Sequence, residues 1–492
     1  MKRQIFNPIF PLDTYIPDGE PHVFGDRVYL YGSHDAEGGE RFCMLDYECW
    51  SAPVDDLTDW RNEGTIYKAE QCPHRTDERQ DMYAPDCVQG NDGRYYLYYC
   101  LGGFEGPISV AVCDTPAGKF EYYGDVKHPN GQPLKKYIPF DPGLLNDNGR
   151  IYLAYGWGLG HDISQLPEEH RKGLYMQLFG KTPEAVEADG PLPILGAQVV
   201  ELKDDMLTVK GEPNRVLDAR ISAPAGSELS KHTFFEAASL RKFGDFYYLI
   251  YSSHETHELC YATSKYPDRE YQFRGVIISN GDIGYNGRKA EDRLAATGTN
   301  HGSLECINGE YYIFYHRNTH LSLYSRQACA EKVTMLPDGT IQQVEVTSCG
   351  LNGGALIPKG TYPAPICCNL TNLRLQHPTG MPGEVINPAP NINHEGNTRF
   401  VKDIEDNTLI GYKYFGFAGD TEISVVTRGK GQGELAVMTE LGKPLVEINI
   451  KPSAEWTPSQ TVCFTANGDL PLYFVYSGTD KIDLLQITFE ER

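Results

Sequence analysis

A short pattern that recurs five times constrains the fold of this 492-residue chain more than any other feature. A glycine turn leads into a run that contains a tyrosine followed by an aliphatic residue. The copies are "FGDRVYLYGS" (24–33), "NDGRYYLYYC" (91–100), "DNGRIYLAYG" (147–156), "FGDFYYLIYS" (243–252) and "INGEYYIFYH" (307–316). A glycine turn that feeds an aromatic strand is typical of a β-hairpin. Five such hairpins predict an all-β fold, a five-bladed β-propeller with about four strands in each blade.

A polar residue precedes each copy at nearly the same distance, about ten to twelve residues before the tyrosine of the pattern. These residues are Asp18, Asp86, Asp141, Glu236 and His301. Taken alone, Asp18 and Asp141 are explained as turn residues, since aspartate before glycine or proline usually belongs to a turn, and His301 is explained as a loop histidine. The innermost strands of a propeller line its central channel, so equivalent positions converge there. The repetition therefore predicts a cluster of four carboxylates and one histidine at one end of the channel.

Two carboxylates that face each other across such a channel suit the hydrolysis of a glycosidic bond. In a five-fold ring, Asp18 and Glu236 would lie about 7–8 Å apart, a separation that leaves room for a water molecule and is typical of inverting glycosidases. Asp141 belongs to the blade next to that of Glu236, and its charge would raise the pKa of Glu236 by repulsion. We therefore expect Asp18 to act as general base, Glu236 as general acid and Asp141 as the residue that tunes the acid.

Composition excludes several other classes of function. The chain has 67 acidic and 44 basic residues, a formal net charge of −23, which disfavours a nucleic-acid partner. It contains no apolar run long enough for a membrane span, and Asn7, Pro8 and Pro11 interrupt any export signal near the N-terminus. The 13 cysteines include no pair at zinc-binding spacing, so reduced thiols and a cytoplasmic location are expected.

Four longer segments carry a resemblance to a known family. They are "PDGEPHVFGDRVYLYGS", "YAPDCVQGNDGRYYLYY", "FDPGLLNDNGRIYLAYG" and "FFEAASLRKFGDFYYLIYSS", and together they resemble glycoside hydrolase family 43. The resemblance implies an inverting five-bladed propeller that acts on arabinose- and xylose-containing polysaccharides, with the same three catalytic carboxylates. It also implies that His301 helps to hold a calcium ion or a water cluster in the channel, and that Arg326 contacts the sugar.

Substrate preference follows less directly from the sequence. Asp86, Tyr83 and Trp157 are further expected substrate contacts, with Asp86 structural or substrate-facing rather than catalytic. We expect an exo-acting enzyme that releases terminal α-L-arabinofuranosyl residues from arabinoxylan- or arabinan-derived oligosaccharides. Its expected partners are therefore its substrates, hemicellulose-derived oligosaccharides. A β-xylosidase with the same three carboxylates, and a propeller that binds sugar without cleaving it, are the alternatives.

A change of pattern marks a second domain. The propeller is expected to span residues 1–350, and a segment rich in glycine and proline follows it. Residues 365–492 show short alternating strands separated by turns, which predict a β-sandwich. The segment "LYFVYSGTDKIDLLQITF" resembles the closing strands of family 6 carbohydrate-binding modules. Trp456 precedes an apolar strand, and we expect it to have a structural role rather than to stack on a sugar.

Overall fold

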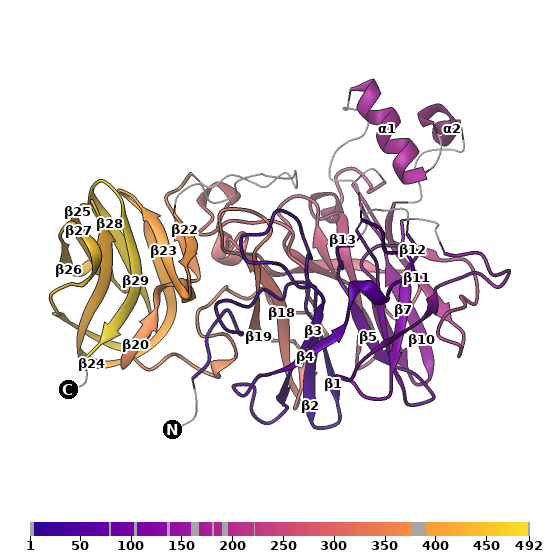
Figure 1. Cartoon of the computed structure of the whole chain (residues 1–492), viewed down its shortest axis with the longest axis horizontal. Helices are drawn as coiled ribbons and strands as arrows, with labels where there is room; N and C mark the ends of the chain where they lie inside the picture. The colour runs from indigo at the N-terminus through magenta and orange to yellow at the C-terminus, as the bar shows by residue number, and fades with distance from the viewer. Residues whose placement is uncertain are drawn as a thin grey trace.

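Five antiparallel sheets follow one another along the chain and form a five-bladed β-propeller, as predicted (Figure 1). The computed structural model describes residues 4–77, 80–102, 106–134, 138–158, 167–179, 182–188, 195–220, 222–374 and 390–490. The five blades consist of β1 (Glu20–Phe24), β2 (Arg27–Tyr31), β3 (Tyr47–Pro53) and β4 (Arg61–Tyr67); β5 (Asp86–Gln89), β6 (Tyr95–Tyr99), β7 (Ser109–Cys113) and β8 (Glu121–Asp125); β9 (Gly143–Asp147), β10 (Arg150–Tyr155), β11 (Gly196–Leu202) and β12 (Asn214–Asp218); β13 (Phe234–Phe243), β14 (Phe246–Ser253), β15 (Leu259–Ser264) and β16 (Gln272–Ile278); and β17 (Leu304–Ile307), β18 (Glu310–Asn318) and β19 (Arg326–Val333).

The first strand of each blade lies at the centre of the ring. Strand β1 contacts both β5 and β17, β5 contacts β9, and β9 contacts β13. The recurring glycine occupies the turn between the first and second strands, where its φ is positive in every copy: Gly25, Gly93, Gly149, Gly244 and Gly309. Glycine adopts this backbone conformation at little cost. The glycine turns therefore fix the hairpin register that brings the first strands to the channel.

The N-terminal segment closes the ring between the first and the last blade. The backbone N–H of Ile9 donates to the carbonyl of Ala328 on β19 (2.9 Å). The buried Asn7 side chain both accepts from the N–H of Ala330 (3.0 Å) and donates to its carbonyl (3.1 Å). These bonds satisfy backbone groups that β19 would otherwise leave unpaired at its outer edge.

The C-terminal domain is built from long strands around one apolar core, as Figure 1 shows in orange and yellow. Strand β24 pairs with β28 over most of its length and with β29 from Ile423 onward, and it also pairs with the short strands β21 and β27. The first strand of this domain, β20, begins at Gly360, slightly before the predicted start at residue 365. Its strands are β20 (Gly360–Pro363), β21 (Asn369–Thr371), β22 (Asn391–Glu395), β23 (Thr398–Ile404), β24 (Leu409–Gly429), β25 (Gln432–Met438), β26 (Pro444–Ile450), β27 (Ser453–Pro458), β28 (Val462–Thr479) and β29 (Ile482–Phe489).

Trp456 of β27 is half-buried and packs against side chains of two other strands of this domain. The Arg428 guanidinium carbon lies 4.3 Å from the centre of its ring, and the Phe400 ring meets it edge-on with the centroids 5.2 Å apart. A guanidinium over an indole face is a favourable cation–π contact. This packing favours the structural role expected for Trp456, while sugar binding by the domain stays a prediction.

Two helices interrupt the third blade between β10 and β11. They are α1 (Glu168–Phe179) and α2 (Pro183–Ala188), and Figure 1 shows them standing away from the strands. The sequence analysis did not predict them, because the strand pattern on either side continues without them. Within the described ranges, neither helix is long and apolar enough to cross a membrane.

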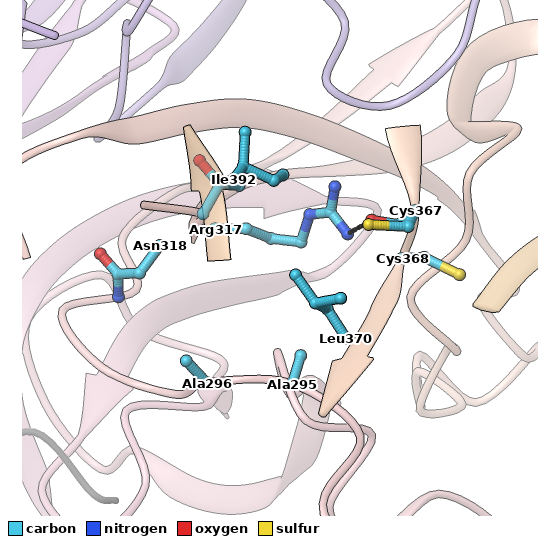
Figure 2. A pocket seen from close by; sticks show the side chains of 9 residues that line it. Ala295, Ala296, Arg317, Asn318, Cys367, Cys368, Leu370 and Ile392 are labelled. Carbon is cyan, nitrogen blue, oxygen red and sulfur yellow. Dashed lines mark hydrogen bonds between the residues drawn. The ribbon is translucent and has the colours of Figure 1, made fainter. Parts of the chain in front are cut away.

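The two domains meet at a small buried cavity (Figure 2). Its volume is about 30 Å³, enough for a single water molecule. Arg317 on β18 reaches across it, and its Nη1 donates to the carbonyl of Cys367 at 3.0 Å. Leu370 on β21 and Ile392 on β22 complete the apolar part of the lining. Side chains of the propeller and of the C-terminal domain thus line the same cavity, and the two domains are in direct contact there.

Candidate active site

The start of each innermost strand carries one of the five polar residues that recur in the sequence. Asp18, Asp141 and His301 precede β1, β9 and β17, while Asp86 begins β5 and Glu236 lies near the start of β13. The Nδ1 atom of His301 lies 3.9 Å from Oδ1 of Asp18 and 3.6 Å from Oδ2 of Asp141. Glu236 adjoins them, because the N–H of the next residue, Ala237, donates to Oδ2 of Asp141 at 3.1 Å. The structure thus brings four of these residues together.

Irregular backbone aims these side chains. Asp18, Asp141 and Ala237 all have positive φ angles, of 58°, 48° and 65°. Strand β13 shifts register against β14 on both sides of Glu236, which is a β-bulge. Non-glycine residues in this backbone region cost about 1–3 kcal/mol each and concentrate at functional sites. Bulges likewise redirect a side chain out of the ladder.

Asp18 is held as an ion by positive and donor groups. Nη1 of Arg326 donates to its Oδ1 at 2.8 Å, and the Ser33 hydroxyl donates to its Oδ2. Its own N–H donates to Nδ1 of the buried His316 (3.2 Å). Burial alone would raise the pKa of Asp18, but the charges of Arg326, His316 and His301 and the hydrogen bond from Ser33 together outweigh it and hold the pKa below the usual value. Asp18 is therefore ionised at neutral pH.

Glu236 and Asp141 have the opposite electrostatic environment. Burial, followed by repulsion from Asp141, raises the pKa of Glu236 to about 8. Burial raises the pKa of Asp141 to about 7, although His301 opposes this rise. The two groups interact strongly and titrate as a pair. Near neutral pH Glu236 therefore holds a proton that it can donate, while Asp18 is ionised.

Charged partners that the sequence analysis missed occupy the channel beside these groups. Glu20 on β1 receives hydrogen bonds from Nη2 of Arg241 (2.6 Å) and from the Ser239 hydroxyl (2.9 Å). Nε2 of His301 lies 3.6 Å from Oε1 of Glu20. Glu20 is the first residue of β1 and follows Asp18 by two positions. That spacing was the available signal.

Three of the expected substrate-binding residues border the carboxylates. The Tyr83 ring packs on Phe140, which precedes Asp141, with the centroids 5.4 Å apart. The Trp157 ring packs on Phe235, which precedes Glu236, with the centroids 6.0 Å apart. Arg326, besides its bond to Asp18, binds the carboxylate of Asp35 through Nε (2.8 Å) and Nη2 (3.0 Å). These positions are compatible with sugar contacts, which stay predictions.

Asp86 belongs to a different cluster of the channel. It is fully buried, its Oδ1 lies 2.5 Å from Nε2 of His22, and its Oδ2 accepts from the N–H of Leu144 at 2.6 Å. Its carboxylate oxygens are thus committed to protein donors. The structure favours the structural alternative for Asp86, and a contact with substrate stays a prediction.

The surroundings of His301 do not fit calcium coordination by its ring. Calcium in proteins takes six to eight oxygen ligands at about 2.3–2.6 Å. Although burial opposes it, hydrogen bonding to Glu20 and the charges of Asp141 and Asp18 raise the pKa of His301 to about 9. Both ring nitrogens therefore carry protons and face carboxylates. The imidazolium supplies one positive charge to the channel, and the predicted calcium site stays a prediction.

Calcium added to fully chelated protein should leave its melting temperature unchanged, because His301, Arg241 and Arg326 already offset the channel carboxylates. Thermal unfolding at neutral pH, with and without calcium, measures this. The matched variants are His301→Gln and His74→Gln, the latter at a half-exposed histidine of the second blade region. A rise in melting temperature with calcium that only His301→Gln abolishes would establish the predicted calcium site instead.

Comparison with known proteins agrees with this geometry. The model of the glycosyl hydrolases family 43 matches residues 5–190 and 194–341. A xylosidase/arabinosidase of Thermoclostridium stercorarium is 42% identical over 99% of this chain and 99% of its own length. A β-xylosidase of Xylanibacter ruminicola is 29% identical over 63% of this chain and 89% of its own.

A solved structure of a family 43 enzyme is similar to the propeller of this chain. A family 43 β-xylosidase/α-arabinofuranosidase from a compost microbial metagenome, crystallised with xylotriose in a calcium-free form, has 26% identity and a TM-score of 0.53, over 70% of this chain and 98% of its own. The fold, the match of the family model over most of the chain and the full-length relative together assign the protein: it is a glycoside hydrolase and belongs to family 43.

Proposed function

We propose that this enzyme is an inverting, exo-acting glycosidase that removes terminal α-L-arabinofuranosyl residues from arabinoxylan- or arabinan-derived oligosaccharides. The observation that carries the proposal is that the environments of Asp18 and Glu236 shift the pKa values of these two carboxyl groups in opposite directions. Arg326, with His316, His301 and Ser33, holds the pKa of Asp18 below its usual value against the effect of burial, whereas burial and Asp141 raise the pKa of Glu236 to about 8. A base and an acid are thus available together at one pH.

The proposed reaction uses each group once. Asp18 accepts a proton from a water molecule while the water oxygen forms a bond to the anomeric carbon of the terminal sugar. Glu236 gives its proton to the glycosidic oxygen as the bond from that oxygen to the anomeric carbon breaks. Asp141 keeps Glu236 protonated before the reaction and accepts the Ala237 N–H, which positions Glu236. Attack from the face opposite the leaving group inverts the anomeric configuration.

A second substrate class is favoured by the names of the relatives. The bacterial relative that matches the whole chain is named for both xylosidase and arabinosidase activity, as is the metagenomic enzyme. We therefore propose terminal β-D-xylosyl residues of xylo-oligosaccharides as the alternative substrates of the same site. The two sugars are both pentoses, so one set of base and acid serves either.

Product stereochemistry and substrate choice test this function together. We expect hydrolysis of nitrophenyl α-L-arabinofuranoside and of arabinoxylo-oligosaccharides, with single pentoses as the first products. Proton NMR of the early product should show the inverted anomer, because a water molecule between base and sugar requires carboxyl groups about 6.5–9.5 Å apart. A product that retains the anomeric configuration would contradict the assignment of Asp18 as base. Faster hydrolysis of the β-xyloside would select the alternative substrate.

The leaving group distinguishes the acid from the base. Glu236→Gln should reduce kcat on oligosaccharides by ~10²–10⁴-fold, because their leaving groups need a proton. On a nitrophenyl glycoside, whose leaving group scarcely needs one, part of the rate should return. Asp18→Asn should lose a similar factor on both substrates, since neither leaving group replaces the base. The control is Glu228→Gln, at an exposed glutamate. Rescue of Asp18→Asn by the nitrophenyl group would interchange the two roles.

The Asp141 charge should set the basic limb of the pH profile. Glu236 is active while protonated, so activity is present below its pKa of about 8 and is lost as pH rises through it. Asp141→Asn removes the repulsion, lowers the pKa of Glu236 and should move the basic limb of kcat/KM to lower pH by ~1 unit. The control is Asp245→Asn, at an exposed aspartate of the fourth blade. An unchanged limb would show that burial alone sets the pKa of Glu236.

A further inference from the structure

Arg317 is a buried cation to which, among the residues that the structure describes, no carboxylate donates a partner oxygen. It is 5% exposed, and its side chain extends from β18 towards Cys367 in the cavity between the two domains (Figure 2). Nη1 donates to the carbonyl of Cys367, but Nε and Nη2 have no hydrogen-bond partner in the protein. A guanidinium keeps its charge at every pH at which a protein is folded. Arg317 thus combines unused donors with an unpaired charge in one buried place.

The described groups around Arg317 do not neutralise it. After burial, the groups that act most on its pKa are three thiols and a phenol, those of Cys329, Tyr315, Cys368 and Cys367. Burial raises the pKa of the thiols to about 11 for Cys329 and Cys368 and to about 12 for Cys367, so all three are uncharged at neutral pH. Burial also raises the pKa of Glu331, a carboxyl that interacts with Arg317, to about 8. A buried charge without compensation is costly.

The cavity beside Arg317 is small and has a defined border. Two backbone hydrogen bonds hold the C-terminal domain against it: the N–H of Leu370 donates to the carbonyl of Leu294 (2.9 Å), and the N–H of Ile392 donates to the carbonyl of Thr319 (3.1 Å). The apolar side chains of the lining are those of Ala295, Ala296, Leu370 and Ile392. At about 30 Å³, the cavity holds one particle of about the size of a water molecule.

An anion suits this cavity better than a water molecule. A water molecule that accepted from Nε and Nη2 would need acceptors for its own two hydrogens, and the carbonyls of Cys367 and Thr319 already accept from Arg317 and Ile392. The unpartnered Oδ1 of Asn318 does not supply one beside Arg317, because successive strand residues point to opposite faces and Figure 2 shows the two side chains directed apart. An anion needs only donors, and the thiol of Cys367 adds a weak S–H donor.

We propose that Arg317 binds one small monovalent anion, chloride, in the cavity between the propeller and the C-terminal domain. Nε and Nη2 donate to the ion, and the charge of the ion offsets that of the guanidinium. The ion stabilises the contact between the domains, because its donors come from β18 of the propeller and part of its apolar wall comes from β21 and β22 of the C-terminal domain. Anions as large as phosphate or gluconate exceed the volume of the cavity.

Bromide is the probe of this site, because it resembles chloride and is located by anomalous X-ray scattering. Crystals of the full-length enzyme in sodium bromide should show an anomalous peak at the bromine edge next to Nε and Nη2 of Arg317. This measurement needs no variant. A site without an anomalous peak would hold a water molecule and would overturn the proposal.

Thermal unfolding shows whether the ion is bound in solution. In ~0.2 M sodium chloride or bromide, the melting temperature should exceed that in sodium gluconate of equal ionic strength by ~2–4 °C, since gluconate does not fit the cavity. Arg317→Met removes the charge and the donors and should abolish this difference. Arg220→Met, at an arginine that is 49% exposed, should keep it and so controls for general effects of the salts.

A second variant and the diffraction experiment keep the result decisive. If Arg317→Met does not fold, Arg317→Gln replaces it with the same expected result, because its amide retains a donor for the carbonyl of Cys367. An equal difference in melting temperature in the wild type, the Arg317 variants and Arg220→Met would assign the salt effect to the surface and overturn the proposal. A bromine peak without a difference that depends on Arg317 would mean an adventitious ion only, which would overturn it as well.

Discussion

The need to pair buried carboxylates in the propeller channel governs how this molecule is built. Asp18, Glu20 and Asp35 are all buried, and each ion taken out of water costs several kcal/mol unless a partner compensates it. Arg326 bridges Asp18 and Asp35, and Arg241 binds Glu20. These residues come from the first, fourth and fifth blades. The ion pairs therefore hold the ring together at the same place where they set the charges of the site.

One channel can hold a base and an acid because its positive groups are unevenly distributed. Arg326 binds Asp18 and favours its ionised form. Among the residues that the structure describes, no arginine donates a hydrogen bond to Glu236, and burial and Asp141 raise its pKa. His301 lies between the two regions, facing Asp18 and Asp141 through one ring nitrogen and Glu20 through the other. A buried imidazolium there reduces the repulsion between the carboxylates and still leaves Glu236 protonated.

The repeated glycine turn made the propeller and its channel residues predictable, because a hairpin of fixed register places equivalent positions at the axis. Arg241 was not predictable, since the bulges around Glu236 break the alternation that would have placed it on the channel face. The helices α1 and α2 were missed because they form an insertion between strands that pair without them. The contact between the domains, in which Arg399 of β23 binds Glu37 of the propeller, was not predictable either, because the two residues share no spacing along the chain.

That contact gives the C-terminal domain a direct connection to the catalytic channel. Arg399 of β23 holds Glu37, and the loop that carries Glu37 also carries Ser33 and Asp35. Ser33 donates to Asp18, and Asp35 positions the arginine that lowers the pKa of Asp18. A displacement of the C-terminal domain would therefore move the loop on which the ionised carboxylate depends. The domain stabilises the geometry of the site from outside the propeller, whether or not it also binds sugar.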